Sequence, residues 1–186
     1  MQTCIALLRG VNVSGQKLIK MKALQAMFEN LGFSNVLTYI QSGNVVFDVK
    51  PTDTGGLEQM ISGAILKTFG FTVSVIVLDK AYLKNISEHN AFISERGLDI
   101  SKLHLTFLSG DPGRIFSESM KQNEYLPDEF YISGKAIYLF CPNGAGNTKL
   151  SNASFEKKLK VRATSRNWKT VLELVKLSER KNKEKE

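Results

Sequence analysis

The chain has 186 residues, 42% of them hydrophobic and 23% charged, with 14 glycines, 4 prolines and a formal net charge of +7 at pH 7. This composition is typical of a folded protein of one domain or two small halves, and it excludes a disordered tail, a collagen-like fibre and a disulfide-stapled miniprotein. No stretch approaches the roughly 20 apolar residues of a membrane span, and the N-terminus lacks the pattern of a secretory signal. We therefore expect a cytoplasmic protein with no membrane partner.

Strand and helix patterns alternate through the first 78 residues in the order β-α-β-β-α-β. The expected elements are a strand at 4–9, a helix at 21–31, and strands at 36–40 and 45–49 joined by a hairpin. A second helix, with apolar positions from Leu57 to Leu66, is expected to end near Gly70, and a strand follows at 72–78. This is the ferredoxin-like order, in which two helices cover one face of a four-stranded antiparallel sheet. We predict a first ferredoxin-like half over residues 1–78.

A helical linker is expected at 79–102, because Asp79 is a good N-cap for a helix that continues to about residue 88. The second half, over 103–178, repeats much of the first. Its expected elements are a strand at 103–108, a helix at 114–121, a hairpin of strands at 129–132 and 135–140, and helices at 150–159 and 168–177. The charged tail at 179–186 is expected to fray into solvent.

Two local similarities indicate an internal duplication. The segment 7–10 is similar to 107–110, and the hairpin at 39–47 is similar to the hairpin at 131–139. We therefore predict an α/β (α+β) fold of two ferredoxin-like halves, with antiparallel sheets covered by helices.

The first candidate binding feature is the strand-to-helix connection at residues 9–20, called here the first loop. It contains Gly10 and Gly15, and it supplies Arg9, Asn12 and Lys17. Glycines allow backbone N–H groups to approach an anion, and the start of a helix adds partial positive charge. The loop matches neither a Walker A motif nor a dinucleotide-binding fingerprint, so a long solvated loop is the alternative interpretation.

The second candidate feature is the hairpin tip at residues 38–44. A plain β-turn explains Gly43 and Asn44, because both residue types tolerate a positive φ angle. If the tip lies against the first loop, Gln41, Ser42 and Asn44 could hydrogen-bond a ligand.

The third candidate feature is a glycine-rich loop at residues 142–150, which ends in Lys149 at the expected start of a helix. Part of its pattern is ordinary helix initiation. Lys149 also opens the most basic part of the chain, because residues 149–170 carry seven basic side chains and one acidic side chain. Such a segment attracts anions locally.

The fourth candidate feature follows Thr164 and Ser165, either of which could cap the last helix. Arg166, Asn167 and Trp168 would then lie in its first turn, where the helix dipole disfavours a cation unless an anion meets it. Trp168, the only tryptophan, is either a core anchor or a platform on which a base stacks.

No metal site and no catalytic motif emerges from the sequence. The cysteines, Cys4 and Cys141, lie in apolar runs, so we expect buried reduced thiols. His89 and His104 stand alone, and we interpret them as a surface residue and a strand residue. The sequence assigns no cofactor, no catalytic residue and no oligomeric state.

Three segments of the chain resemble the signature segments of a bacterial family, domain of unknown function 1697. They are residues 6–13 (ALLRGVNV), 37–47 (LTYIQSGNVVF) and 163–170 (ATSRNWKT). The resemblance spans nearly the whole chain in the right order. It implies two ferredoxin-like α/β halves, and it implies no established activity, substrate or cofactor.

The leading functional hypothesis is a protein that binds a phosphorylated or otherwise anionic ligand, either a nucleotide or a nucleic-acid segment. Arg9, Asn12, Lys17, Lys149 and Arg166 would meet the anion, Gln41 and Asn44 would orient it, and Trp168 or Tyr39 could stack a ring. One alternative is an enzyme that acts on a small anionic metabolite in a groove between the halves. The other is a protein-interaction module whose basic segment docks an acidic partner.

Overall fold

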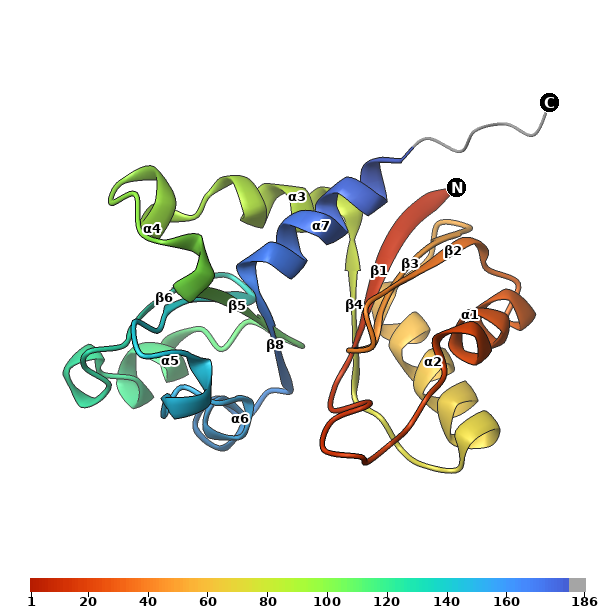
Figure 1. Ribbon diagram of the computed structural model, residues 1–186, viewed down its shortest axis with the longest axis horizontal. Coiled ribbons are helices and arrows are strands. Elements are labelled where there is room, and N and C mark those ends of the chain that lie inside the picture. The colour runs from red at the N-terminus through yellow and green to blue at the C-terminus, as the bar shows by residue number, and fades with distance from the viewer. Residues whose placement is uncertain (181–186) are drawn as a thin grey trace. The chain divides into compact units, whose positions relative to one another are not determined.

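The computed structural model describes residues 1–180, so positions 181–186 of the expected frayed tail lie outside the described residues. The chain forms two compact units (Figure 1). The first unit comprises residues 1–84 and the chain from Glu173 on, and the second unit comprises residues 85–172. The division falls inside helices α3 (Lys80–Glu88) and α7 (Trp168–Glu179), which the sequence placed in the linker and in the second half. No helix of residues 1–180 combines the length and the apolar character needed to cross a membrane.

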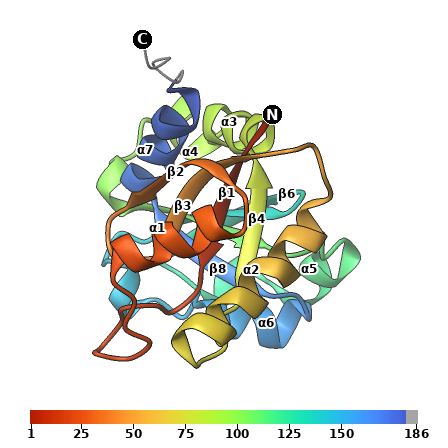
Figure 2. The ribbon, with the colours of Figure 1, turned by 90° about the vertical axis from the view of Figure 1, so that its right-hand side faces the viewer.

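The first unit contains an antiparallel sheet with the strand order β2-β3-β1-β4. Its strands are β1 (Gln2–Leu8), β2 (Ser34–Tyr39), β3 (Asn44–Val49) and β4 (Val75–Asp79). Two helices, α1 (Met21–Asn30) and α2 (Thr54–Phe69), lie across one face of this sheet (Figure 2). This arrangement is the predicted ferredoxin-like one.

The core of the first unit lies between its sheet and these two helices. Side chains alternate along a strand, so Cys4, Ala6 and Leu8 of β1 point to the same face. All three are fully buried, and they belong to one apolar cluster with Phe28 of α1 and Ile61 of α2. Ile5 and Leu7, on the opposite face of β1, are also fully buried, so β1 is a central strand buried on both of its faces.

The second unit contains a sheet of the same design, with the strand order β6-β7-β5-β8. Its strands are β5 (Leu103–Leu108), β6 (Glu129–Ser133), β7 (Ala136–Phe140) and β8 (Ala163–Asn167). Helices α5 (Arg114–Ser119) and α6 (Asn152–Leu159) lie on one face of this sheet (Figure 1). Short 3-10 turns occur at η1 (Ile100–Lys102), η2 (Gln122–Glu124) and η3 (Ala145–Asn147).

The opposite face of the second sheet is also covered. The hydroxyl of Tyr138 on β7 donates a hydrogen bond to the carbonyl of Ile86, in the last turn of α3, at 2.8 Å. The ring of Trp168, at the start of α7, lies 6.3 Å from the ring of Tyr138, measured between centroids. The ring of Phe92, in α4 (Ala91–Ser94), lies 5.1 Å from the ring of Tyr131. The second sheet is therefore a middle layer, buried on both sides.

One element differs from the sequence prediction. Residues 163–167 form strand β8, where the sequence suggested a helix cap followed by the first helical turn. The strand was missed because Thr164, Ser165 and Asn167 are polar and give no apolar alternation. It is nevertheless paired with β5 over its full length, with Leu105 opposite Arg166. Tertiary pairing, and not local propensity, makes it a strand.

Both units thus have an antiparallel four-stranded sheet, helices on its face and one strand order, which gives the expected α+β fold. The shared order is consistent with the predicted duplication.

The two thiols provide a test of this fold. Burial, together with the charge of Asp79, raises the pKa of Cys4 to about 11, and burial, together with Asp128, raises the pKa of Cys141 to about 11. Because the thiolate is the reactive form, both cysteines should resist a disulfide reagent at neutral pH in the native protein. Colour release in a dithionitrobenzoate assay should appear only after denaturation. Prompt reaction of either thiol in the native protein would contradict its burial.

Candidate functional site

The side chain of Asn12 joins the first loop to the hairpin tip. Its Nδ2 donates hydrogen bonds to the carbonyls of Ile19 (3.0 Å) and Gln41 (2.8 Å), and its Oδ1 accepts one from the Ile19 N–H (2.8 Å). The bond to Gln41 holds the first loop against the hairpin tip, and the two bonds to Ile19 close the first loop on itself. The two features that the sequence suggested separately therefore adjoin in the first unit, with Asn12 as their clasp.

Backbone strain is concentrated where these two segments meet. Positive φ angles occur at Gly10, Asn12, Ser14, Gly15 and Lys17 of the first loop, and at Ile40 and Gly43 of the hairpin tip. For a β-branched residue such as Ile40, with a φ of 47°, this conformation is a real outlier. Strained backbone of this kind clusters at functional sites, where the surrounding structure holds it in place.

Gly43 is required by space as well as by φ. A Cβ atom there would lie 2.5 Å from Cγ2 of Val11 and 2.7 Å from Cβ of Leu8. The Gly43 carbonyl also accepts a hydrogen bond from the Leu8 N–H at 2.8 Å. The hairpin tip therefore packs directly on the end of β1.

Most of the polar side chains predicted in the first unit serve this architecture. Lys17 Nζ donates a hydrogen bond to the Thr72 carbonyl at 2.8 Å and holds the loop down. Asn44 is completely buried, and its Nδ2 donates to the Tyr39 carbonyl (3.1 Å) and to Ser42 Oγ (3.0 Å), as in an ordinary turn. Arg9 is half-buried at the end of β1.

A groove lies beside the clasp, with a volume of about 590 Å³. It is lined by Asn12, Leu18, Ile19, Lys20, Met21, Lys22 and Gln41. Lys20 and Lys22 were not among the predicted site residues. Their position on either side of the first residue of α1 is the sequence signal that could have singled them out.

The residues predicted in the second unit do not gather at one place within it. Lys149 lines a small cleft of about 120 Å³ with Asp128 and Asn143. Arg166 points to the other face of the sheet from its neighbour Ser165, because side chains alternate along β8. Its Nη1 donates to Thr164 Oγ1 (2.9 Å) and to the Ser165 carbonyl (2.8 Å), and burial lowers the pKa of its guanidinium to about 10.

Two roles expected at the start of the last helix need correction. Arg166 lies in β8 and not in the first helical turn, so the helix dipole gives no reason for an anion there. Trp168 is 1% exposed, and its buried ring leaves no face for a base to stack on. Asn167 is the N-cap of α7, since its Oδ1 accepts a hydrogen bond from the Thr170 N–H at 2.8 Å.

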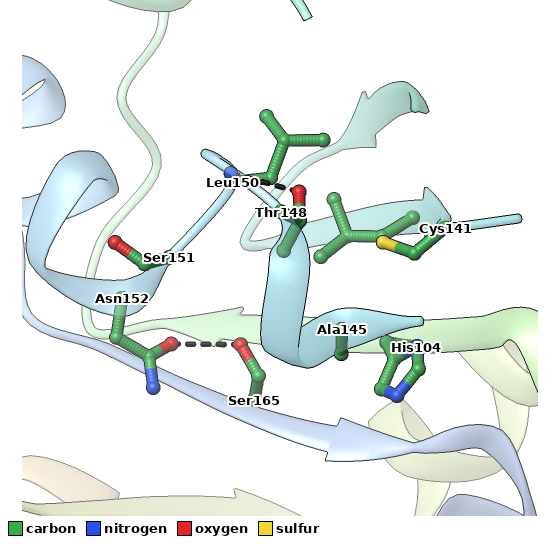
Figure 3. A pocket seen from close by; sticks show the side chains of 9 residues that line it. His104, Cys141, Ala145, Thr148, Leu150, Ser151, Asn152 and Ser165 are labelled. Carbon is green, nitrogen blue, oxygen red and sulfur yellow. Dashed lines mark hydrogen bonds between the residues drawn. The ribbon is translucent and has the colours of Figure 1, made fainter. Parts of the chain in front are cut away.

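A polar pocket that the sequence did not reveal lies on the α6 side of the second sheet (Figure 3). It has a volume of about 220 Å³ and is lined by His104, Leu139, Cys141, Ala145, Thr148, Leu150, Ser151, Asn152 and Ser165. His104, interpreted above as an isolated strand residue, shares its sheet face with Thr106, two positions along β5. A histidine and a threonine on the helix-facing side of an otherwise apolar strand were the available signal.

The pocket holds the imidazole of His104 in an unusual environment. Burial lowers its pKa, and the nearby Lys102 carbonyl opposes this effect only in part. Within residues 1–180, Nδ1 of His104 is enclosed and makes no hydrogen bond of good geometry. In the same described range, no three side chains of His, Cys, Asp or Glu gather as a metal site.

Substitution of Gly43 tests the contact between the hairpin tip and β1. Gly43→Ala combines a positive φ with overlap against Val11 and Leu8, so it should destabilise the protein by about 2–4 kcal/mol. The matched control is Gly134→Ala in the second hairpin, where φ is also positive but a Cβ meets nothing within 4 Å. Urea unfolding followed by circular dichroism compares the two. If both variants are destabilised equally, the overlap with Val11 and Leu8 does not contribute to the cost of Gly43→Ala, and the prediction is wrong.

The pKa of His104 predicts how stability depends on pH. The folded-state pKa lies below the ordinary value of 6.5, so the unfolded chain takes up this proton first as pH falls. Stability should therefore decrease below about pH 6.5. Urea unfolding monitored by Trp168 fluorescence should show this loss, and His104→Gln should reduce it. The exposed His89 carries the control substitution, His89→Gln. An unchanged pH profile in His104→Gln would contradict the prediction.

Comparison with known proteins places the fold in context. A family model described as "Protein of unknown function (DUF1697)" matches residues 1–138. Among solved structures, the conserved bacterial protein SP0830 from Streptococcus pneumoniae superposes with a TM-score of 0.68 and 24% sequence identity, covering 96% of this chain and 99% of that one. No curated protein matches. At this identity the structural similarity shows the fold alone, whereas the family match spans most of the sequence. This chain therefore belongs to the DUF1697 family.

Proposed function

We propose that the protein binds a phosphorylated or otherwise anionic ligand, a nucleotide or a nucleic-acid segment, in the groove beside Asn12 in the first unit. The observation that carries this proposal is the start of α1. Lys20, in the N-cap position, makes no side-chain capping bond, and the first turn contains no acidic residue. Lys20 and Lys22 are exposed beside it and line the groove.

This helix start is unfavourable without a ligand. The hydrogen bond from the Leu24 N–H to the Lys20 carbonyl, at 3.0 Å, closes the first turn, and the N–H groups before it have no partner within the helix. They contribute partial positive charge, and the two lysines add to it where an acidic residue would be stabilising. An anion in the groove would relieve both effects, as at other phosphate-binding helix starts.

The clasp supports this proposal because it fixes the groove before a ligand arrives. Asn12 and Lys17 hold the first loop through hydrogen bonds to Gln41 and Thr72, so little of the loop must be ordered on binding. Gln41 then lies on the groove wall and can orient a bound group through its amide. In this proposal Arg9 adds to the positive field, and Asn44 and Ser42 act indirectly, by shaping the turn.

The proposal predicts that the two groove lysines dominate anion binding. Lys20→Gln with Lys22→Gln should weaken binding of a fluorescent oligouridine about tenfold or more in an anisotropy titration, since each lost phosphate contact lowers both the affinity and its salt dependence. The matched control is Lys50→Gln with Lys67→Gln, which removes two exposed lysines of the same unit outside the groove.

Competition by ATP and by pyrophosphate distinguishes a nucleic acid from a small ligand. Displacement of the oligouridine only by other polynucleotides, with a steep salt dependence, supports a nucleic-acid segment. Equal displacement by ATP supports a nucleotide. If the groove variant binds every anion as tightly as the control variant, the proposal fails.

A further inference from the structure

The two sheets differ at equivalent positions. In the first unit Leu8 pairs with Val75 and Ala6 with Val77, and in the second unit Leu108 pairs with Ala163 and Thr106 with Ser165. Cys4, Ala6 and Val77 of the first unit correspond in this register to His104, Thr106 and Ser165 of the second. The first set is buried within the apolar core beneath α1 and α2. The second set is polar.

This exchange is not required by the fold. A ferredoxin-like sheet packs well with an apolar trio, as the first unit shows, whereas buried polar groups cost free energy unless they are hydrogen-bonded. Thr106 is completely buried, and its Oγ1 lies 2.6 Å from Ser165 Oγ. Thr106 is buried, and His104 and Ser165 are half-buried at positions where the first unit has buried apolar residues, which calls for a functional explanation.

The hydroxyls form a directional chain that ends at the pocket. Ser165 Oγ donates its proton to Asn152 Oδ1 at 2.7 Å, so Thr106 must be the donor in the 2.6 Å contact with Ser165. With its oxygen held in this way, Asn152 presents its Nδ2 amide as a hydrogen-bond donor at the pocket wall (Figure 3). Among the described residues, Nδ2 has no hydrogen-bond partner.

The lining of the pocket selects the chemistry of an occupant. None of its nine residues is acidic, and none is lysine or arginine. The donor groups are Asn152 Nδ2, the imidazole of His104, the protonated thiol of Cys141 and the hydroxyls of Thr148 and Ser151. Leu139, Leu150 and Ala145 supply apolar walls. A volume of about 220 Å³ is smaller than the roughly 300–1,000 Å³ of drug-sized sites. A multiply charged phosphate would find no cationic side chain here. A short alkyl chain bearing one carboxylate fits the pocket, because the donor groups can bind the carboxylate and the apolar walls can cover the alkyl group.

We propose that the pocket formed by His104, Asn152 and Ser165 in the second unit binds a small aliphatic carboxylate, with Asn152 Nδ2 and His104 donating to the carboxylate oxygens and the leucines covering the alkyl group. This site is separate from the anion groove of the first unit, and neither proposal depends on the other.

Propionate is the probe for this site, and the two histidine ring signals in a proton–carbon NMR spectrum are the readout. The His104 signal should move saturably, with a Kd on the order of 1 mM as expected for a ligand this small, while the signal of His89 stays in place. Propanol, which has the alkyl group without the charge, should move neither signal.

The decisive variant is Asn152→Asp. An aspartate keeps an oxygen to accept from Ser165 and suits the first turn of a helix, so the fold is retained, but it replaces the donor by a negative charge. Propionate affinity should fall at least about tenfold. Asn143→Asp adds the same charge on an exposed loop position of the same unit that does not line the pocket, and it should leave the affinity unchanged.

A second variant guards against loss of folding. Thr106→Ala with Ser165→Val reproduces the apolar pair of the first unit and should unfold at the same urea concentration or a higher one, while its His104 signal no longer responds to propionate. The proposal is overturned if propionate does not move the His104 signal of the wild-type protein, if inorganic phosphate moves it more strongly, or if Asn152→Asp binds propionate as tightly as Asn143→Asp does.

Discussion

The alternation of side chains along β5 and β8 decides which polar residues of the second unit can meet. Neighbours in sequence are separated by the thickness of the sheet, while residues opposite each other on paired strands share one face. Ser165 therefore meets Thr106 across the strands, and Arg166, one position later, turns to the other face with Thr164. The most distinctive segment of the sequence, 163–170, is thereby divided among a pocket wall, the opposite face of the sheet and the start of a helix.

The first unit concentrates its unusual backbone geometry around one amide. Asn12 bonds Ile19 and Gln41, and around it lie several residues with positive φ angles, including the β-branched Ile40. Such conformations cost about 1–3 kcal/mol each for residues other than glycine, so a solvated linker would not be expected to collect them. The arrangement holds Lys20, Lys22 and Gln41 around one groove. Rigidity at a loop, where proteins usually tolerate variation, is what makes this region a candidate site.

Periodic patterns predicted the architecture well, because the buried positions of a strand or helix are occupied by apolar residues at a regular spacing in the sequence. The sequence showed the apolar run of β1, the hairpin tip at 38–44 and the helix cap at Asp79. In the structure, Asp79 Oδ1 accepts a hydrogen bond from the Tyr82 N–H at 2.7 Å. The sequence identified the first loop and the hairpin tip but not the clasp between them, because Asn12 and Gln41 are brought together only by the fold. The pocket was missed for the same reason: His104, Asn152 and Ser165 come from three separate elements, and β8 has no apolar period of its own.

The first unit is discontinuous in sequence, because helix α7 passes from the second unit into the first between Leu172 and Glu173. During synthesis the ribosome releases residues 1–84 early, yet the segment from Glu173 on, which completes their unit, is made only after residues 85–172. No single cut in the gene can therefore yield both units intact, and a shortened N-terminal fragment would lack part of its own unit. The first unit is therefore complete only after the second unit has been synthesised, which couples the completion of one unit to the synthesis of the other.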